Sequence, residues 1–395
     1  MRVHSVELKI IDDSRLDPTI EASLNLDGQE ASASVPSGKS KGKNEAVVVE
    51  PQKALYLLED IKSRITQTDF NALEEFDLFL NKLDGTADKH RLGGNLILAL
   101  SSAFTKAWAK LQKLETFQLI AKISNQKAAR SPLLFFNLIE GGVHVKNGPA
   151  FQEYLFVPDL PGAEQSLKSA QGMIKVLGGI IQERYGQLVY GDEGGFSIGS
   201  DNPEAGLQLL DTARKQLGQE QSFLSLDVAA STFYRDGRYK VGQNFLTWSE
   251  LFNLYVGFVD KYNLLSIEDP YGESDYGGFE NITAKLGGKI WVVGDDLTTT
   301  NVQLIKRAQK DNLVNAVIIK PTQIGSVSEA IRAALLAKSY GWKIIISHRS
   351  GETMDDFIAD LAFGLGADGL KAGSPSQKER LVKYERVVRI EELRA

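Results

Sequence analysis

Alternating apolar and polar positions near the start of the chain predict a β-hairpin. Between residues 19 and 26 every second position is apolar: Ile20, Ala22, Leu24 and Leu26. The pair Asp27-Gly28, typical of a tight turn, follows, and the alternation then resumes toward Val35. Two antiparallel strands joined at this turn are therefore expected.

Longer segments with a different period follow the hairpin. The ranges 51–65, 70–82 and 94–112 show helical spacing and many leucines. The stretch 121–131 is polar and weakly patterned, which is typical of a boundary between domains. The first third of the chain is thus expected to be α+β.

Beyond the boundary, short apolar runs each close on a polar residue. Eight are found: 132–139, 154–158, and six that end at Asp227, Glu268, Asp295, Lys320, His348 and Lys371. Helical stretches near 163–184 and 203–217 follow the second run, and the later gaps are long enough for one helix each. This order predicts an α/β fold with an irregular (β/α)8 barrel of the form ββαα(βα)6. We expect residues 1–125 to form a smaller N-terminal α+β capping domain and residues 126–395 the catalytic barrel.

Composition narrows the classes of function. The 395 residues are 43% hydrophobic and 24% charged, as in ordinary globular proteins, and the net charge of −6 argues against nucleic-acid binding. No apolar run approaches a membrane span, and acidic residues near the start oppose a signal peptide, so a cytoplasmic location is expected. The absence of cysteine excludes disulfides, thiolate metal sites and a cysteine nucleophile.

Three carboxylates end successive strands of the predicted barrel: Asp227, Glu268 and Asp295. The ends of barrel strands meet at one rim, and several carboxylate oxygens together suit Mg²⁺. Any one of these residues alone would more often cap a helix or form a salt bridge. Three in succession favour a metal site.

Two lysines, a histidine and an arginine follow on the same rim. Lys320 and Lys371 end apolar strands, and lysine is seldom buried without a partner, although a snorkelling surface lysine is the plain alternative. Beside a cation, one lysine would serve as a general base while the other binds an anion. The loop 347–351 offers Ser347, His348, Arg349 and Ser350, donors suited to phosphate, or is an ordinary turn with a surface arginine.

Further acidic and flexible segments lie earlier in the chain. Gln152-Glu153 starts the second strand, and Glu193 lies in the glycine-rich loop 191–195. Paired carboxylates can share a proton and supply a general acid, or can be solvated loop charges. His144 follows the first strand, where a structural role is the commoner one. The loop 38–42 is either a mobile lid whose Ser40 reaches a metal or phosphate, or a basic hairpin tip.

Long motifs in order along the chain make it resemble the enolase family. They are GDEGGF (191–196), LDVAAS (226–231), SIEDP (266–270), VGDDLT (293–298), QIGS (323–326), SHRSGET (347–353) and LKAGSP (370–375). The resemblance covers nearly the whole chain. It implies reversible, Mg²⁺-dependent dehydration of 2-phosphoglycerate to phosphoenolpyruvate, two Mg²⁺ ions per active site, and a homodimer or larger homo-oligomer.

The resemblance also implies a role for each matched residue. Asp227, Glu268 and Asp295 would hold the first Mg²⁺, and Ser40 would close over the second. Lys320 would remove the C2 proton, and Glu193 would assist departure of the C3 hydroxyl with Glu153 beside it. Lys371 would bind the substrate carboxylate, while the remaining pocket and phosphate contacts would come from His144, Gln152, Ser347, His348, Arg349 and Ser350.

The chain departs from the family pattern near the site. Its segment 37–42 reads SGKSKG where the family usually has SGASTG, and 47–50 reads VVVE in place of an acidic segment. Glu140 and Val143 alter the usual NGGSH, and Thr322 replaces a common asparagine. Two alternatives therefore stay open. One is a related lyase or epimerase acting on another hydroxy acid, and the other is a non-catalytic binding protein with this fold.

Overall fold

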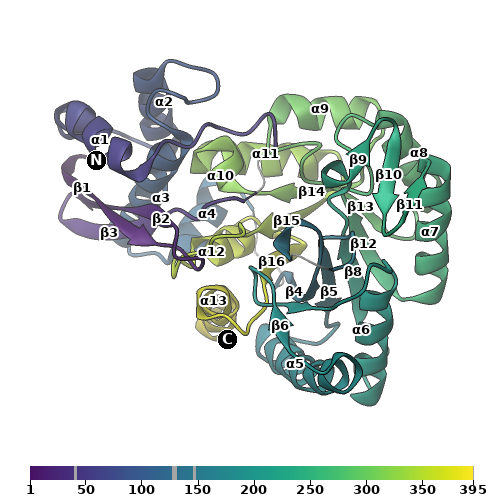
Figure 1. Cartoon of the computed structure of the whole chain (residues 1–395). Coiled ribbons are helices and arrows are strands. Elements are labelled where there is room, and N and C mark those ends of the chain that lie inside the picture. Colours follow the sequence, from purple (N-terminus) through teal and green to yellow (C-terminus); the bar gives the residue numbers. More distant parts are fainter. Residues whose placement is uncertain (40–41, 127–130, 146–147, 395) are drawn as a thin grey trace.

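The fold is described from a computed structural model of the protein (Figure 1). Its N-terminal part is a three-stranded antiparallel sheet covered by helices. The structure describes residues 1–39, 42–126, 131–145 and 148–394. The sheet order is β1 (Val3–Asp12), β2 (Pro18–Leu26), β3 (Gln29–Ser34). The helices are α1 (Pro51–Thr66), α2 (Leu73–Asp84), α3 (Gly94–Leu111) and α4 (Thr116–Ile123).

The predicted hairpin is β2 and β3. Leu24 pairs with Ala31, and the turn places Asp27 and Gly28 at positive φ, which two-residue hairpin turns require. The alternating apolar side chains of β2 are all buried on the face that meets α3. Burial of this face is what selects the register, since a shift of one residue would expose every one of them.

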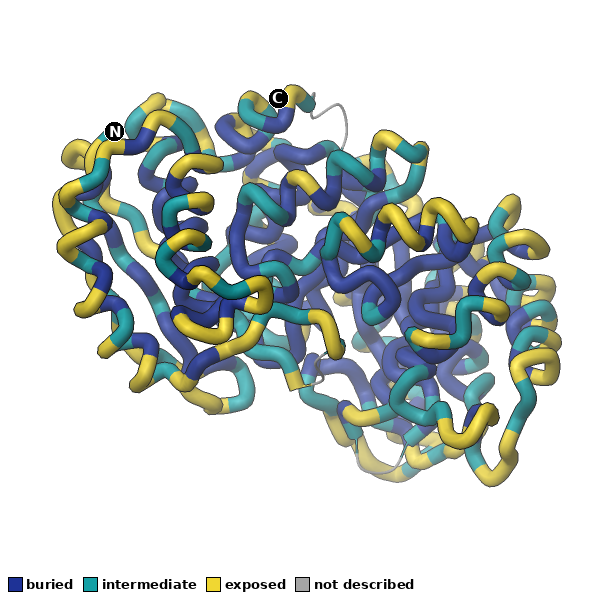
Figure 2. The backbone as a smooth tube through the Cα atoms, turned by 90° about the horizontal axis from the view of Figure 1, so that it is seen from above, coloured by how far each residue is buried: buried dark blue, intermediate teal, exposed yellow. Residues whose placement is uncertain are grey.

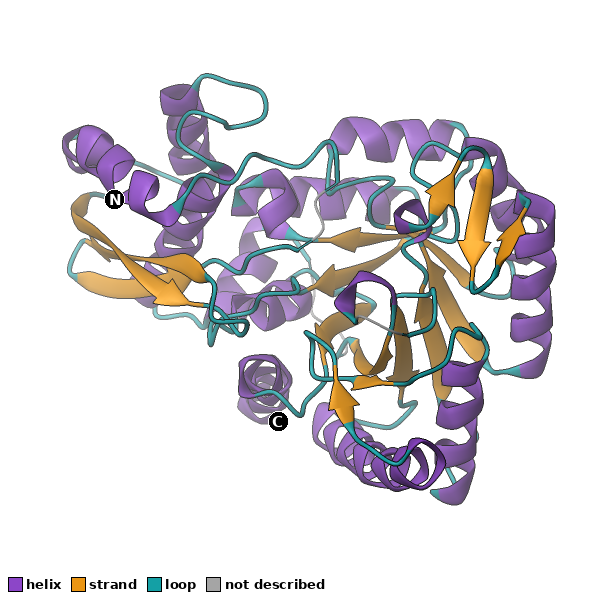
Figure 3. Ribbon diagram, viewed as in Figure 1, coloured by secondary structure: helices purple, strands orange, loops and turns teal. Residues whose placement is uncertain are grey.

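Eight strands close into the predicted barrel (Figure 3). Their bounds are β4 (Leu133–Glu140), β5 (Glu153–Val157), β8 (Phe223–Asp227), β12 (Leu264–Glu268), β13 (Trp291–Gly294), β14 (Ala316–Ile319), β15 (Lys343–Ser347) and β16 (Gly369–Gly373). Neighbours pair in the order β4-β5-β8-β12-β13-β14-β15-β16, and β16 pairs back to β4. β5 runs antiparallel to β4 and β8, whereas the other barrel pairs are parallel.

Helices separate the strands as expected for ββαα(βα)6. They are α5 (Ala163–Tyr185), α6 (Ala205–Gln216), α7 (Trp248–Lys261), α8 (Tyr276–Leu286), α9 (Val302–Lys310), α10 (Pro321–Ile324), α11 (Val327–Ser339), α12 (Phe357–Gly364) and α13 (Lys378–Arg394). Both α5 and α6 follow β5, which confirms the irregular beginning. Buried positions occur throughout both parts of the chain, and exposed positions lie mainly on the outer helices and loops (Figure 2).

Several short elements lie outside the predicted pattern. A hairpin of β6 (Val189–Tyr190) and β7 (Phe196–Ser197) extends the barrel sheet from β4. A small separate sheet holds β9 (Tyr234–Arg235), β10 (Arg238–Val241) and β11 (Asn244–Leu246). The helix α4 reaches into the stretch interpreted as weakly patterned, because Phe117, Leu119 and Ile120 give it a buried face.

No helix in the described part of the chain has the length and apolar character that crossing a membrane requires.

Candidate active site

One end of the barrel gathers the polar residues that close its strands. Asp227 at the end of β8 lies level with Glu268 at the end of β12, and Ser347 of β15 lies level with Lys371 of β16. β5 runs in the opposite direction, so its first residue, Glu153, pairs with Asp227 on the same rim. All five side chains are buried.

The Lys371 ammonium lies at the centre of three carboxylates. Its Nζ is 2.8 Å from Asp227 Oδ2, 2.8 Å from Glu268 Oε2 and 3.3 Å from Glu153 Oε1. Gln152 also donates from Nε2 to Asp227 Oδ2 at 3.4 Å. The structure thus brings these five predicted residues together around one cation.

Burial and repulsion change the proton affinity of this cluster. Burial, and then the Asp227 carboxylate, raises the pKa of Glu268 to about 8. Burial raises the pKa of Glu153 well above its usual range, and Glu193 adds to the effect. Burial alone would lower the pKa of Lys371, but the carboxylates outweigh it and raise that pKa instead. Lys371 therefore keeps its proton, and Glu153 and Glu268 bind protons more tightly than free carboxyl groups do.

Lys320 lies beside this cluster and contacts Asp295. Its Nζ donates to Asp295 Oδ2, while Gln323 Nε2 donates to Asp295 Oδ1 at 2.8 Å. Thr300 supports both, since its hydroxyl donates to Gln323 Oε1 at 2.7 Å and accepts the Lys320 N–H at 2.9 Å. Burial alone would lower the pKa of Lys320, but Asp295 and Glu268 raise it overall.

Glu193 lies across the site among nitrogen donors. Asn137 Nδ2 donates to Glu193 Oε2 at 3.1 Å, and His348 Nε2 lies 3.3 Å from the same oxygen. Arg380 approaches His348 Nδ1 at 2.5 Å, and because arginine only donates, Nδ1 is an acceptor. His348 therefore carries its proton on Nε2, facing Glu193, and burial lowers its pKa to about 4, so the ring is neutral.

Arg349 and Ser350 lie at the mouth of the site. The Arg349 guanidinium contacts the Glu45 carboxylate at 2.8 and 3.2 Å and donates to Thr322 Oγ1 at 3.0 Å. Ser350 Oγ accepts the N–H of Lys39 at 2.8 Å, and the Lys39 ammonium lies 2.7 Å from Asp192. The predicted lid residue Ser40 lies outside the described residues.

The site encloses little space in this conformation. A cavity of about 30 Å³ is lined by predicted residues from every part of the site, among them Glu193, Lys320, Arg349 and Lys371. That volume holds only one or two water molecules. Gly38 and Glu45 form part of its wall. Entry of a larger anion would therefore require this wall to move.

The donors fit a hard divalent cation. Glu268 Oε1 and Glu153 Oε2 are buried with no hydrogen-bond partner among the residues that the structure describes. Such orphaned carboxylate oxygens are suitable Mg²⁺ ligands. Asp227, Glu268 and Asp295 share this rim, although Asp227 and Glu268 face Lys371 and Asp295 faces Lys320.

Two tighter groups of potential ligand atoms occur within the described ranges. One contains Asp269, Asp295 and Asp296, and the other contains His144, Glu153 and Glu193. Neither is the predicted set of three. The Asp269 carboxylate accepts hydrogen bonds from the backbone N–H groups of Asp295 and Asp296 at 2.9 and 2.7 Å. The side chains of Asp295 and Asp296 line the cavity of the site. Glu193 and His144 are better suited to proton transfer, since their neighbours are proton donors and acceptors.

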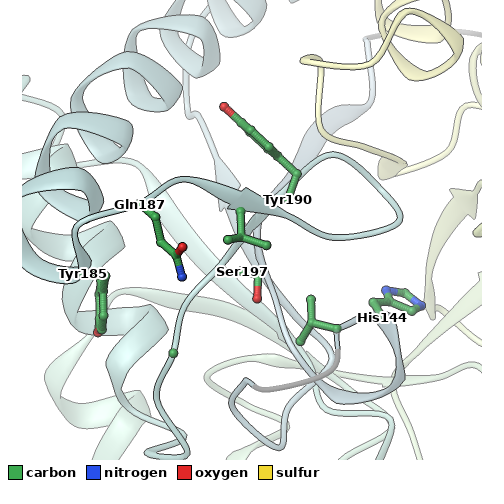
Figure 4. Close-up of a pocket in the computed structure, with 8 residues that line it drawn as sticks. His144, Tyr185, Gln187, Tyr190 and Ser197 are labelled. Atoms are coloured by element: carbon green, nitrogen blue, oxygen red, sulfur yellow. The ribbon is translucent and has the colours of Figure 1, made fainter.

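A second and larger pocket, here called the outer pocket, borders His144 (Figure 4). It has a volume of about 620 Å³ and is bordered by Tyr185, Gln187, Tyr190 and Ser197. His144 lines both this pocket and the inner cavity. His144 is therefore a residue that the two cavities share.

Sequence reasoning missed several residues that hold the site. Arg380 of α13 is buried and supports His348, Asn137 of β4 contacts Glu193, and Glu45 pairs with Arg349. The sequence could have pointed to Asp269 and Asp296, because each directly follows a carboxylate predicted at the end of a strand. Arg380 and Glu45 carry no such signal, since their partners are distant in the sequence.

Comparison with known proteins gives matches over nearly the whole chain. The model "Enolase, N-terminal domain" matches residues 3–120 and "Enolase, C-terminal TIM barrel domain" matches residues 129–395. The chain is 38% identical to "Enolase 1" of Methylococcus capsulatus, covering 99% of this chain and 97% of the relative. It is 37% identical to "Enolase 2" of Pseudomonas syringae pv. syringae (99% and 96%) and 36% identical to "Enolase" of Solanum lycopersicum (99% and 95%).

Proposed function

Because the chain belongs to the enolase family, we propose that it is a phosphopyruvate hydratase. This carbon–oxygen lyase would reversibly dehydrate 2-phospho-D-glycerate to phosphoenolpyruvate, in glycolysis and gluconeogenesis. One observation carries the proposal: Lys320, a candidate base, and Glu193, a candidate acid, come from different barrel loops and line a single buried cavity. Loss of water from 2-phosphoglycerate removes a proton from C2 and a hydroxyl from C3, so it needs a base and an acid at two neighbouring carbons.

The chain's own residues would divide the work as follows. Arg349 and Ser350 would bind the phosphate, and the Lys371 ammonium would bind the carboxylate. Lys320 Nζ would remove the C2 proton, and Glu193 would protonate the departing C3 hydroxyl. Glu153, whose pKa is raised by burial and by the Glu193 carboxylate, would lie beside the acid.

His144, Gln152, Ser347 and His348 would complete the pocket. His348 would donate from Nε2 to Glu193 and keep that side chain turned toward the cavity. This orientation is supported by Arg380, which occupies the other ring nitrogen.

Magnesium is part of the proposal. Asp227, Glu268 and Asp295 would hold one ion, and Ser40 would contribute to a second in the catalytic complex. Bound there, divalent cations would supply positive charge beside the substrate carboxylate as C2 loses its proton and would favour the neutral amine of Lys320.

A second candidate function follows from the Glu45–Arg349 ion pair. A guanidinium already paired with a carboxylate would suit a substrate without a phosphate, so a lyase or epimerase acting on another hydroxy acid is the alternative. A panel of phosphorylated and non-phosphorylated 2-hydroxy acids separates the two, since preference for the latter would remove the role given to Arg349 and Ser350. A non-catalytic binding protein would instead bind no Mg²⁺.

Assembly is proposed from the family, whereas location, the lack of a nucleic-acid partner and the domain bounds are proposed from the composition, charge and patterning of the sequence. We propose a homodimer or larger homo-oligomer in the cytoplasm, with no nucleic-acid partner and with the division into domains 1–125 and 126–395.

The proposed activity has a simple optical test. Phosphoenolpyruvate absorbs in the ultraviolet, so absorbance should rise when 2-phosphoglycerate and Mg²⁺ are added. The Lys320→Ala variant should give no rise, while Glu59→Gln, an exposed helical position in α1, should match the parent chain. Equal rates from Lys320→Ala and the parent, or no rise from the parent, would overturn the proposal.

A further inference from the structure

Glu140 places an additional buried carboxyl directly behind the candidate acid. It ends β4 and is fully buried. The loop 191–195 wraps around it: Gly195 N–H donates to Oε1 at 2.6 Å, and Glu193 N–H lies 3.1 Å from Oε2. The carboxyl fills the space inside the loop so closely that Gly191 has no room for a side chain. Glu140 thus determines where the backbone of Glu193 lies.

His144 lies within reach of both carboxyl groups. Its Nδ1 is 3.6 Å from Glu140 Oε2 and 3.8 Å from Glu193 Oε1. The same nitrogen is buried and makes no hydrogen bond to any described residue. A small rotation of the ring would bring Nδ1 to hydrogen-bond distance of either oxygen. His144 also borders the outer pocket (Figure 4).

The charges around Glu140 favour one shared proton. Burial, and then the Glu193 carboxylate, raises the pKa of Glu140 to about 8, against the opposing effect of the two backbone N–H groups and of Arg380. Burial would also raise the pKa of Glu193, but His348 and His144 outweigh it and lower that pKa. Glu153 of β5 and Asp192 of the loop are the other acids nearby. Burial lowers the pKa of His144, which is therefore neutral.

We propose that Glu140 is a positioning residue for the proposed reaction and shares one proton with Glu193 through His144. This inference rests on the proposed function. The proton leaves Glu140 Oε2 for His144 Nδ1, and the imidazolium passes it to Glu193 Oε1, so Glu140 becomes the carboxylate and His144 is again neutral. After the product water departs, a proton from solvent in the outer pocket restores Glu140.

The pH profile of dehydration tests the shared proton. In the parent chain, the fall of kcat/KM at high pH reports loss of the proton that Glu140 and Glu193 share. In Glu140→Gln, the same fall reports loss of the proton from Glu193 alone. The fall is expected to move to lower pH by about one unit, because the neighbouring negative charge that strengthens proton binding is gone. A fall at an unchanged pH, or an equal loss of rate at every pH, would overturn the proposal. Glu140→Asn, the residue usual in the family, replaces Glu140→Gln if the latter does not fold.

Infrared difference spectra of the substrate-free protein give a test independent of activity. Between pH 6 and pH 9 the parent should lose the C=O stretch of a buried protonated carboxyl, and the loss should be smaller by one group in Glu140→Gln. Equal losses would overturn the shared proton even in an active enzyme. A smaller loss in the variant together with an inactive parent would sustain the carboxyl pair and reject the proposed function.

Discussion

The Glu45 carboxylate and the Arg349 guanidinium form a two-point ion pair, with oxygen–nitrogen distances of 2.8 and 3.2 Å. Both side chains are less than a tenth exposed. The forked geometry is the one that arginine also offers to a phosphate. The Glu45 carboxylate therefore takes up the guanidinium donors that the phosphate of the proposed substrate would need. A phosphate can bind Arg349 in this way only if it replaces Glu45.

Removal of the Glu45 charge should strengthen phosphate binding. We expect Glu45→Gln to bind inorganic phosphate at least about tenfold more tightly than the parent, since a hydrogen bond to a charged group is worth about 1.5–3 kcal/mol. Titration calorimetry measures the affinity of each chain for inorganic phosphate. The variant Glu59→Gln, at an exposed position, is the control. Equal affinity in the two variants would show that Glu45 does not compete with the anion.

Lys39 should contribute a salt-sensitive attraction at the mouth of the site. Its ammonium contacts Asp192 at 2.7 Å and is nearly half exposed, so the interaction is worth roughly 0.2–1 kcal/mol. Lys39→Ala is expected to raise the KM for 2-phosphoglycerate about two-fold at low salt, and the difference should vanish at about 0.5 M KCl because of screening. A difference that persists at high salt would point to a contact other than charge.

The strands and their ends were predictable, whereas the contacts between distant loops were not. Most barrel strands are short apolar runs that end at or beside a polar residue such as Asp227 or Glu268, because burial on both faces demands apolar residues and the rim alone meets the site. The antiparallel direction of β5 leaves no mark on local pattern, although it is what places Glu153 on the rim. Arg380 and Glu45 likewise meet their partners only through tertiary folding.

Asp77 should weaken the fold as the pH rises. It is buried in α2, and burial raises its pKa from 3.8 to about 6, while hydrogen bonds from Ser101 and Ser328 oppose the shift. The folded state thus binds the proton more tightly than the unfolded state, and stability is lost between about pH 4 and pH 6. At ~1.36 kcal/mol per pKa unit the loss is about 3 kcal/mol above that range.

The Asp77→Asn variant removes this ionisation. Its free energy of unfolding in urea should equal that of the parent near pH 4 and exceed it above pH 6, by up to about 3 kcal/mol if the amide keeps the hydrogen bonds. A difference between the two chains that does not change with pH would refute the assignment.

Lys371 should stabilise the fold when Mg²⁺ is absent. Lys371→Met leaves Glu153, Asp227 and Glu268 buried without the ammonium that they contact, and breaking a buried pair costs about 3–5 kcal/mol. Millimolar Mg²⁺ should then raise the melting temperature more in this variant than in the parent, while EDTA reverses the gain. Lys168→Met, at an exposed lysine of α5, is the matched control. Equal Mg²⁺ effects in all three chains would argue against a cation among these carboxylates.

The division of labour between Lys320 and Glu193 is tested most directly by hydrogen exchange at C2. In D₂O with Mg²⁺ and 2-phosphoglycerate, proton NMR follows replacement of the C2 hydrogen before any product forms. We expect Glu193→Gln to exchange this hydrogen while forming almost no phosphoenolpyruvate, and Lys320→Ala to do neither. Exchange that survives in Lys320→Ala, or that disappears in Glu193→Gln, would contradict the assignment of base and acid.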